Sequence, residues 1–251
     1  MTQDLFRTDA TLRECSAIVT NVSPVGIVLD RTVFYPLGGG QAGDAGVLLL
    51  IDGQMIQIAD TRKHKDADGR PTAGIVHVPA AGQDAALAAL AIGAVVSARI
   101  DWSRRHRMMR FHTTTHLLCH LVPQLVNGCS ITPDYARLDF NMTEPLDKDE
   151  LSAGIAALVA AALPVTVGAI TDDELDANPS LVKSMSVQPP RGSGQIRTIR
   201  IGNADAAAGN MIDYQPCGGT HVANTAEIGA VLVTKIEKKS ATTRRVVLGF
   251  A

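Results

Sequence analysis

Short apolar runs alternate with turn residues through the first 98 residues, and this pattern constrains the fold more than any other feature of the sequence. Gly, Pro, Asn and Asp separate four strand-like runs, at 18–30, 32–36, 46–60 and 73–79. A short helical turn at 84–93 and a strand at 95–101 follow them. Because strands this short and frequent are typical of small barrels and sandwiches, we expect a small β-barrel here, with a sandwich as the alternative.

A long amphipathic stretch opens the second half of the chain. From Ser103 to Val126 apolar residues recur at helical spacing, which predicts a helix with Ser103 as N-cap that ends near Pro123. Later segments are predicted as a strand at 135–142, a helix at 147–163 capped near Asp147, a strand at 164–170, an acidic turn at 171–176 and a hairpin at 227–250. We therefore expect an α+β protein with two domains, residues 1–98 and residues 99–251.

Composition excludes several classes of protein. The chain has 23 Lys and Arg residues against 25 Asp and Glu residues, a net charge of −2, which rules out a broadly basic nucleic-acid binder but not a local basic face. No apolar run reaches the roughly 18 residues of a membrane-spanning helix, and the N-terminus lacks the pattern of a secretory signal. The four cysteines form no CxxC pair, so we expect reduced thiols and a cytoplasmic protein without a membrane partner.

Two His/Cys pairs carry the chemistry of this sequence. His112 and His116 stand at i and i+4 of the predicted long helix, where their Cβ atoms would lie about 6 Å apart on one face. About a hundred residues later, Cys217 and His221 flank a Gly-Gly pair that permits a tight turn. Each pair alone is weak evidence for a metal site, since histidine and cysteine residues at such spacing are more often unrelated surface or core side chains. Together they form a Cys/His₃ set, a mixture of ligands that suits zinc.

A zinc protease is the first function to test against this pattern. The protease signature HExxH requires a Glu general base directly after the first histidine. Thr113 occupies that position here. A protease is therefore excluded.

The motifs around the two pairs resemble those of the editing domain of alanyl-tRNA synthetase and of its free-standing relatives, the AlaX proteins. They are DWSRRHRMMRFHTTTHLL, ARLDF, CGGTHVANTAEIGAVLV and the Gly-rich FYPLGGGQAGDAG, which together cover the chain from about residue 30 to its end, with gaps. Two positions depart from the common pattern, Thr114 in place of Ala and Ala42 in place of Pro. Neither is a proposed ligand. Thr114 would alter a pocket wall or pack against the next helix.

The resemblance implies a barrel domain with a Gly-rich loop, followed by a two-layer α/β editing domain. It implies a zinc site made by His112, His116, Cys217 and His221. It also implies hydrolysis of the ester that joins a wrong amino acid to tRNA(Ala), with serine the first expected substrate and glycine the second. Nothing in the chain resembles an ATP-dependent aminoacylation domain, so we expect a trans-editing protein that needs no ATP. The motifs give no oligomeric state.

A second hydrolytic site has a physical rationale. A pocket for alanine cannot exclude glycine by size, and it rejects the added hydroxyl of serine only weakly. Two other functions stay open: a noncatalytic, zinc-stabilised tRNA-binding module, and a zinc hydrolase of another small ester or amide.

The role of zinc also stays open at the level of sequence. Four protein ligands normally describe a structural zinc. Either one ligand is weak or replaced by water, or the ion becomes five-coordinate, or it only shapes the pocket. Cys217 would then be a ligand and not a nucleophile. No general base is identified, although His106 and His120 are candidates by position.

Two further sets of residues are predicted to contact the substrate. The first would line the amino-acid pocket and comprises Gly38, Gly39, Gly40, Gln41, Ser130 and Thr132. A tight barrel turn is the alternative for the glycines. The second would contact tRNA phosphates and comprises Arg104, Arg105, Arg107, Arg110, Lys238 and Lys239. A solvated charged face is the alternative for each of these.

Overall fold

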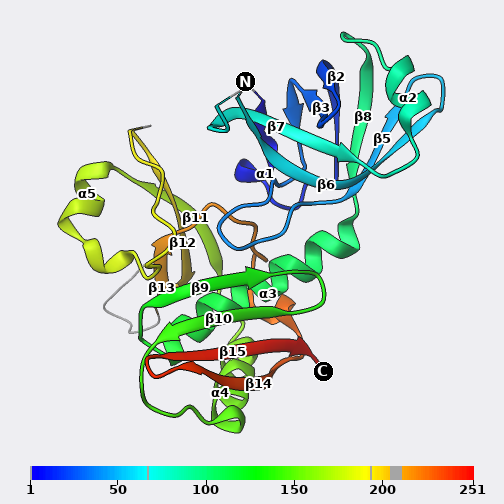
Figure 1. The fold of residues 1–251 in the computed structure, drawn as a ribbon. Coiled ribbons are helices and arrows are strands. Elements are labelled where there is room, and N and C mark those ends of the chain that lie inside the picture. The colour runs from blue at the N-terminus through cyan, green and yellow to red at the C-terminus, as the bar shows by residue number, and fades with distance from the viewer. Residues whose placement is uncertain (1, 67, 193, 204–210) are drawn as a thin grey trace. The chain divides into compact units, whose positions relative to one another are not determined.

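The structure is a computed structural model that describes residues 2–66, 68–192, 194–203 and 211–251. Its class is mixed α+β, which confirms that expectation (Figure 1). The chain divides into two compact units, one of residues 1–38 and 42–106, the other of residues 39–41 and 107–251. Within the described residues, no helix has the length and apolar character needed to cross a membrane.

Six strands of the first unit close a barrel in the order β2-β3-β7-β6-β5-β8. These strands are β2 (Glu14–Ser23), β3 (Gly26–Leu29), β5 (Gly46–Leu50), β6 (Met55–Lys65), β7 (Pro71–Pro79) and β8 (Val95–Ile100). The remaining elements of this unit are β1 (Gln3–Asp4), α1 (Leu5–Thr8), β4 (Arg31–Thr32) and α2 (Asp84–Ala89). The strand predicted at 32–36 is wrong, because the Thr32 hydroxyl accepts a hydrogen bond from the Phe34 N–H and ends β4.

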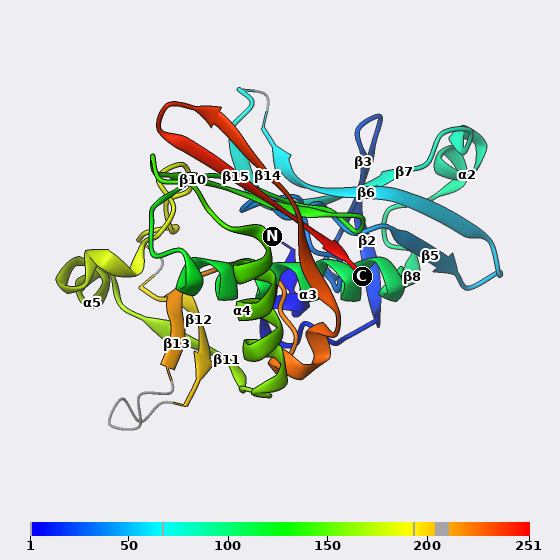
Figure 2. The same cartoon turned by 90° about the horizontal axis from the view of Figure 1, so that it is seen from below.

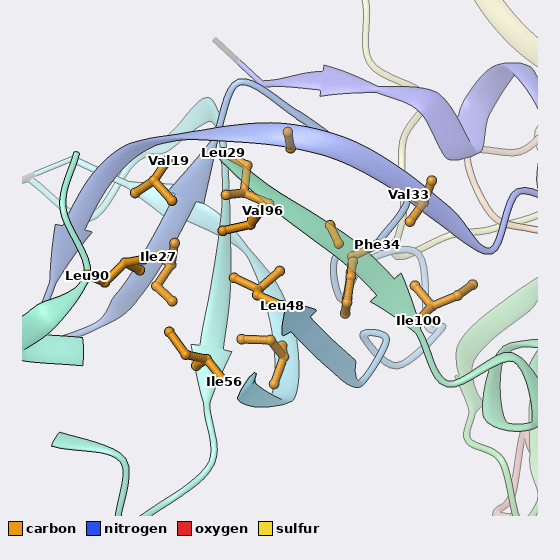
Figure 3. Packing of buried hydrophobic residues seen from close by; sticks show 13 residues of the cluster. Val19, Ile27, Leu29, Val33, Phe34, Leu48, Ile56, Leu90, Val96 and Ile100 are labelled. Atoms are coloured by element: carbon orange, nitrogen blue, oxygen red, sulfur yellow. The ribbon is translucent and has the colours of Figure 1, made fainter. Parts of the chain in front are cut away.

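The barrel interior is filled by one alternating face of its strands, as a period of two requires. Figure 3 shows Leu48, Ile56, Val96 and Ile100 pointing inward beside Phe34. Each of these side chains is buried. Burial of this apolar face is what closes the sheet on itself.

His77 on β7 is a polar side chain in this unit that is completely buried. Its Nδ1 lies 3.1 Å from the Ile27 carbonyl oxygen and its Nε2 lies 2.8 Å from the Thr32 hydroxyl. The Ile27 carbonyl only accepts, so Nδ1 carries the proton, and in the neutral ring the Thr32 hydroxyl donates to Nε2. These partners suit the neutral, Nδ1-protonated imidazole, and burial lowers the pKa of His77 to about 4.

This histidine should make the protein sensitive to mild acid. The unfolded chain takes up a proton below about pH 6.5, whereas the folded protein resists protonation of His77 until about pH 4. Stability should therefore be full above pH 6.5 and fall by about 3 kcal/mol as the pH approaches 4. Urea unfolding of the native protein and of His77→Gln, measured from pH 7.5 to 4.5, checks this. An equal pH dependence in the two proteins would contradict it.

Arg105 and Asp44 form a completely buried ion pair within the first unit. The guanidinium also donates to the carbonyl oxygens of Val33 and Ala10, and the Asp44 carboxylate accepts from the Tyr35 N–H. Removing one partner of such a pair typically costs about 3–5 kcal/mol, because it leaves an uncompensated buried charge. Arg105 is thus committed to the interior, and its predicted contact with tRNA phosphate is wrong.

The second unit is built on a four-stranded antiparallel sheet in the order β14-β15-β10-β9. Its strands are β9 (Val126–Ile131), β10 (Ala136–Asn141), β14 (Val231–Ser240) and β15 (Thr243–Phe250). Helices α3 (Trp102–Leu121) and α4 (Lys148–Ala160) lie on the same side of this sheet (Figure 2). Buried Leu138, Phe140, Val246 and Leu248 line the strands from which these helices exclude water.

A smaller antiparallel sheet with the order β11-β12-β13 completes the second unit. Its strands are β11 (Val165–Ile170), β12 (Ile196–Gly202) and β13 (Met211–Pro216). Short helical segments are α5 (Asp172–Ala177), η1 (Pro179–Leu181) and η3 (Thr225–Ile228). The acidic turn predicted at 171–176 is wrong, since Thr171 and Glu174 form a capping box that starts α5.

Other helix ends follow local rules. Asp147 caps α4 as predicted, accepting from the N–H groups of Asp149 and Glu150. The long helix α3 ends before Pro123 as expected, but it begins at Trp102. Asp101, and not Ser103, accepts the first free N–H, that of Arg104, at 3.0 Å.

Candidate metal centre

Helix α3 presents two histidines on one face. His112 and His116 are one helical turn apart, both are buried, and their ring centroids lie 5.5 Å apart. This is the consequence of i, i+4 spacing in a regular helix. The surrounding turns carry Thr113, Thr114 and Thr115, whose hydroxyls each donate to a backbone carbonyl of the preceding turn.

The segment after β13 brings Cys217 and His221 to the same place. At Gly219 the backbone lies directly against the His112 ring, and a Cβ there would overlap the imidazole. Arg197 on β12 fixes this segment from behind, since its Nη1 donates to the Cys217 and Gly219 carbonyls at 2.6 and 3.0 Å. A glycine at position 219 is therefore required by close approach to a ligand.

The four side chains converge. The ligand atoms of His112, His116, Cys217 and His221 all lie within 4.8 Å of one another, close enough to hold one metal ion. The Cys217 Sγ is 3.5 Å from His112 Nε2 and 3.3 Å from His221 Nε2. The three histidines are buried and Cys217 is half-buried.

Each histidine has its outer nitrogen, Nδ1, held by a different oxygen. The His112 Nδ1 is 2.8 Å from Gln41 Oε1, and the His116 Nδ1 is 2.7 Å from Asp213 Oδ2. These oxygens only accept hydrogen bonds, so both Nδ1 atoms carry the proton and both Nε2 lone pairs face inward.

His221 is oriented in the same way from within α3. Its Nδ1 is 3.2 Å from the Thr113 hydroxyl, which already donates to the Met109 carbonyl and so accepts from the imidazole. Thr113, which excluded the protease, thus positions a ligand. Three imidazole nitrogens and one sulfur, each with a fixed orientation, are a donor set that fits zinc.

The electrostatics of the cluster favour a bound cation. Burial alone would raise the pKa of the Cys217 thiol, but the imidazoles of His112 and His221 lower it well below its usual range. Burial would lower the pKa of His116, yet Asp213 and Cys217 raise it to about 9. Burial lowers the pKa of His221 to about 3, which keeps this ligand neutral. The negative surroundings that raise the proton affinity of His116 also attract a metal ion.

Asp213 anchors the cluster, and sequence reasoning missed it. It is completely buried on β13, and its two carboxylate oxygens have different partners. Oδ2 accepts from His116 and from Gln215 Nε2, at 2.7 and 2.8 Å, while Oδ1 pairs with the Lys183 ammonium. Burial would raise the pKa of Asp213, but His116 and Lys183 lower it to about 2.

The Gly-rich loop has a different role from the predicted one. Gly39 and Gly40 have positive φ, and a Cβ at Gly40 would lie 2.9 Å from the Cys129 sulfur, so the loop runs tightly along β9. It buries Gln41, whose Oε1 accepts from His112 and from the Thr220 N–H, and whose Nε2 donates to the Thr220 hydroxyl. Gln41 therefore supports the candidate ligands, and its predicted contact with substrate stays a prediction.

The other predicted pocket residues lie elsewhere. Gly38 belongs to the first unit, where its carbonyl accepts from the Tyr35 hydroxyl. Ser130 lies on the opposite face of β9 from its neighbour Cys129, because successive side chains of a strand alternate. The Thr132 hydroxyl donates to the Tyr135 carbonyl at 2.9 Å, within the β9–β10 turn. The pocket roles of Ser130 and Thr132 stay predictions.

The predicted basic residues divide into two groups. Arg107 and Arg110 are half-buried, and both guanidinium groups lie over the Phe250 ring at 4.3 and 4.2 Å. Their Nε atoms donate to backbone carbonyls, at 2.6 Å each. Lys238 and Lys239 are exposed at the end of β14.

The remaining candidates are placed as follows. Arg104 is half-buried and donates to the Gly43 carbonyl. His106 stacks on Trp102, with ring centroids 5.4 Å apart. His120 is exposed, unlike the ligands on the same helix. Neither histidine is assigned as a general base.

Comparison with known proteins finds relatives that are all named for alanyl-tRNA synthesis or editing. Residues 196–247 match the family described as threonyl and alanyl tRNA synthetase second additional domain. The chain is 30% identical to the alanyl-tRNA editing protein AlaX-M of Saccharolobus solfataricus, over 98% of both chains. It is 31% identical to AlaX-M of Methanosarcina barkeri, over 98% of this chain and 97% of that one. It is also 32% identical to an alanine–tRNA ligase of Metallosphaera sedula, of which it spans only 25%.

Loss of the Gln41 support should weaken metal binding. Gln41→Met removes the acceptor of the His112 Nδ1–H, and outer partners of this kind are typically worth about 10- to 100-fold in metal affinity. Competition with a chromogenic chelator measures zinc affinity, with exposed Gln124→Met as the matched control. Equal zinc affinity in the native protein and the Gln41 variant would contradict the assignment.

Proposed function

The chain belongs to the family of AlaX-M alanyl-tRNA editing proteins, and on that premise we propose that it deacylates mischarged tRNA(Ala) in trans, in the cytoplasm. Serine is the principal amino acid removed and glycine the second. The observation that carries this proposal is the convergence of three oriented imidazoles and one thiolate in a chain that matches free-standing editing proteins over nearly their whole length. We assign the chemistry to the second unit, which contains all four side chains.

Zinc is the ion proposed for this site. His112, His116 and His221 would bind it through Nε2, and Cys217 through its thiolate. Bound there, zinc would supply Lewis acidity beside the ester. Because Cys217 is held as an anionic ligand, it is not free to act as a nucleophile.

The four side chains differ in accessibility, which bears on how substrate enters. Four protein donors fill a tetrahedral zinc site, so chemistry at the ion requires a fifth position or a yielding ligand. Cys217 is half-buried whereas the three histidines are buried, so we place the approach of the aminoacyl ester on its side. The histidines, each tied at Nδ1, hold their places during that approach.

Selection between serine and alanine must come from a polar contact. A site that hydrogen-bonds the serine hydroxyl is left with an unpaired buried group when alanine enters, at a cost of about 1–3 kcal/mol. Glycine would be accepted because it is smaller. The same site would spare correctly charged tRNA, which is the purpose of editing.

Hydrolysis of charged tRNA tests the proposal. Purified protein should release serine from Ser-tRNA(Ala) rapidly, glycine more slowly, and alanine from Ala-tRNA(Ala) least. A chelator, or Cys217→Ala, should remove zinc and abolish release, since the variant deletes the sulfur donor. Full activity of metal-free protein would contradict a role of zinc in catalysis. Intact substrate in the presence of zinc-loaded protein would instead favour the tRNA-binding module.

The exposed lysines of the C-terminal hairpin test the tRNA surface. Lys238→Glu/Lys239→Glu should weaken tRNA binding and flatten its dependence on salt. The slope of log K against log salt concentration should become smaller by about 1 to 2, because binding releases fewer counterions when phosphate contacts are lost. Filter binding from 50 to 300 mM salt measures the slope, with exposed Lys148→Glu as control. An unchanged slope would place the RNA surface elsewhere.

A further inference from the structure

We infer that a cavity beside the metal centre, between α5 and the start of β9, binds an unstacked nucleobase from the single-stranded 3′ end of the tRNA. This inference rests on the proposed function, because it assumes that the ester at the metal site is carried by RNA. The cavity has a volume of about 340 Å³. That volume lies at the lower end of the range for small-molecule sites, about 300–1,000 Å³.

The lining of the cavity combines apolar and polar side chains. Leu125, Leu175, Val182 and Met185 form the apolar part, and Ser184, Gln188, Asp176 and Arg191 form the polar part. Leu125 and Met185 are 47% and 52% exposed, which is unusual for large apolar side chains that face one cavity. Such a pocket, apolar with a few converging polar groups, is typical of a ligand site.

The charge of the rim selects a neutral ligand. Arg191 and Asp176 are paired at 2.7 Å, so their charges compensate each other. A phosphate or an ammonium group would meet both charges and gain little from either. A nucleobase is neutral, has an apolar face for Met185 and Leu125, and has donors and acceptors at its edge for Gln188 and Ser184. Bases of single-stranded RNA are recognised by this combination of stacking and edge contacts.

The position of the cavity links it to the metal centre. Residues 183–185 pair with the start of β9 through an isolated bridge between Ser184 and Val126. The Val126 N–H donates to the Lys183 carbonyl and the Met185 N–H donates to the Val126 carbonyl, at 2.9 Å each. Val182 and Ser184 line the cavity, while Lys183 between them reaches Asp213, which holds the ligand His116. Residues 182–185 therefore contribute side chains both to the cavity and to the support of the metal centre.

The cavity lies next to the metal centre but outside it, which suits the base of the nucleotide that precedes the one carrying the ester. The terminal nucleotide must place its ester at the metal ligands, and the preceding base is one nucleotide away along a flexible single strand. Capture of that base would fix the strand without touching the reacting atoms. It should therefore contribute to binding of the RNA and not to the chemical step.

A charged substitution in the cavity tests the inference. Met185→Asp should weaken binding of deacylated tRNA(Ala) about tenfold, which corresponds to about 1.4 kcal/mol. The KM for Ser-tRNA(Ala) should rise by the same factor, with kcat and zinc content unchanged. Met55→Asp, at an exposed methionine of the barrel strand β6, is the matched control. Native affinity in the Met185 variant would overturn the inference.

A second comparison assigns the effect to the base. tRNA(Ala) with an abasic site at either of the two nucleotides before the terminal adenosine should bind the native protein about tenfold more weakly at one of them. The same abasic site should cost Met185→Asp almost nothing, because the contact is already lost. Equal costs in the two proteins would overturn the inference. Binding with this pattern in a protein that hydrolyses nothing would refute the proposed deacylation while retaining the nucleobase site.

Discussion

The geometry of the metal centre depends on fixing the outer nitrogen of every histidine. Three oxygens do this, from an amide in the Gly-rich loop, a buried carboxylate on β13 and a hydroxyl within α3 itself. With Nδ1 committed in each ring, only Nε2 faces the Cys217 sulfur. Because the three oxygens come from segments far apart in the sequence, the tertiary fold must be complete before the ligand atoms converge. The centre is consequently preorganised by protein contacts, which is what lowers the cost of ordering a ligand sphere.

Local spacing was enough to predict that these four side chains converge, but it could not show what holds them. His112 and His116 share a face by the geometry of any helix, and the Gly-Gly pair after Cys217 marks a tight approach. Asp213 has no such signal, since its contact with His116 arises only when β13 pairs with β12 and turns toward α3. The role of Gln41 was equally hidden, because its partners lie at 71 and 179 residues' separation. Residue spacing that repeats along a helix can therefore be used to predict which side chains share a face. Contacts between segments far apart in the sequence cannot be predicted in this way.

The arginines at the start of α3 show how a charge cluster can mislead. In sequence they look like a basic face for phosphates, but their side chains serve the interior. Arg105 neutralises Asp44 without exposure to solvent, and Arg107 and Arg110 cover the Phe250 ring while donating to carbonyls. A guanidinium can do this because it is planar, has five donors and is weakly hydrated. Lysine cannot replace it there, and the exposed basic groups at the C-terminal hairpin are lysines, which keep their hydration.

The outer edge of β9 pairs with two segments that support the candidate metal centre. At one end of the strand the Ile131 N–H donates to the Gly40 carbonyl, next to the glutamine that holds a ligand. At the other end Val126 exchanges backbone hydrogen bonds with residues 183–185, whose side chains serve Asp213 on one side and the cavity on the other. Backbone pairing to the same strand fixes both segments relative to the candidate ligands. A change in the cavity can then leave the ligand side chains in place, as long as β9 itself keeps its place in the sheet.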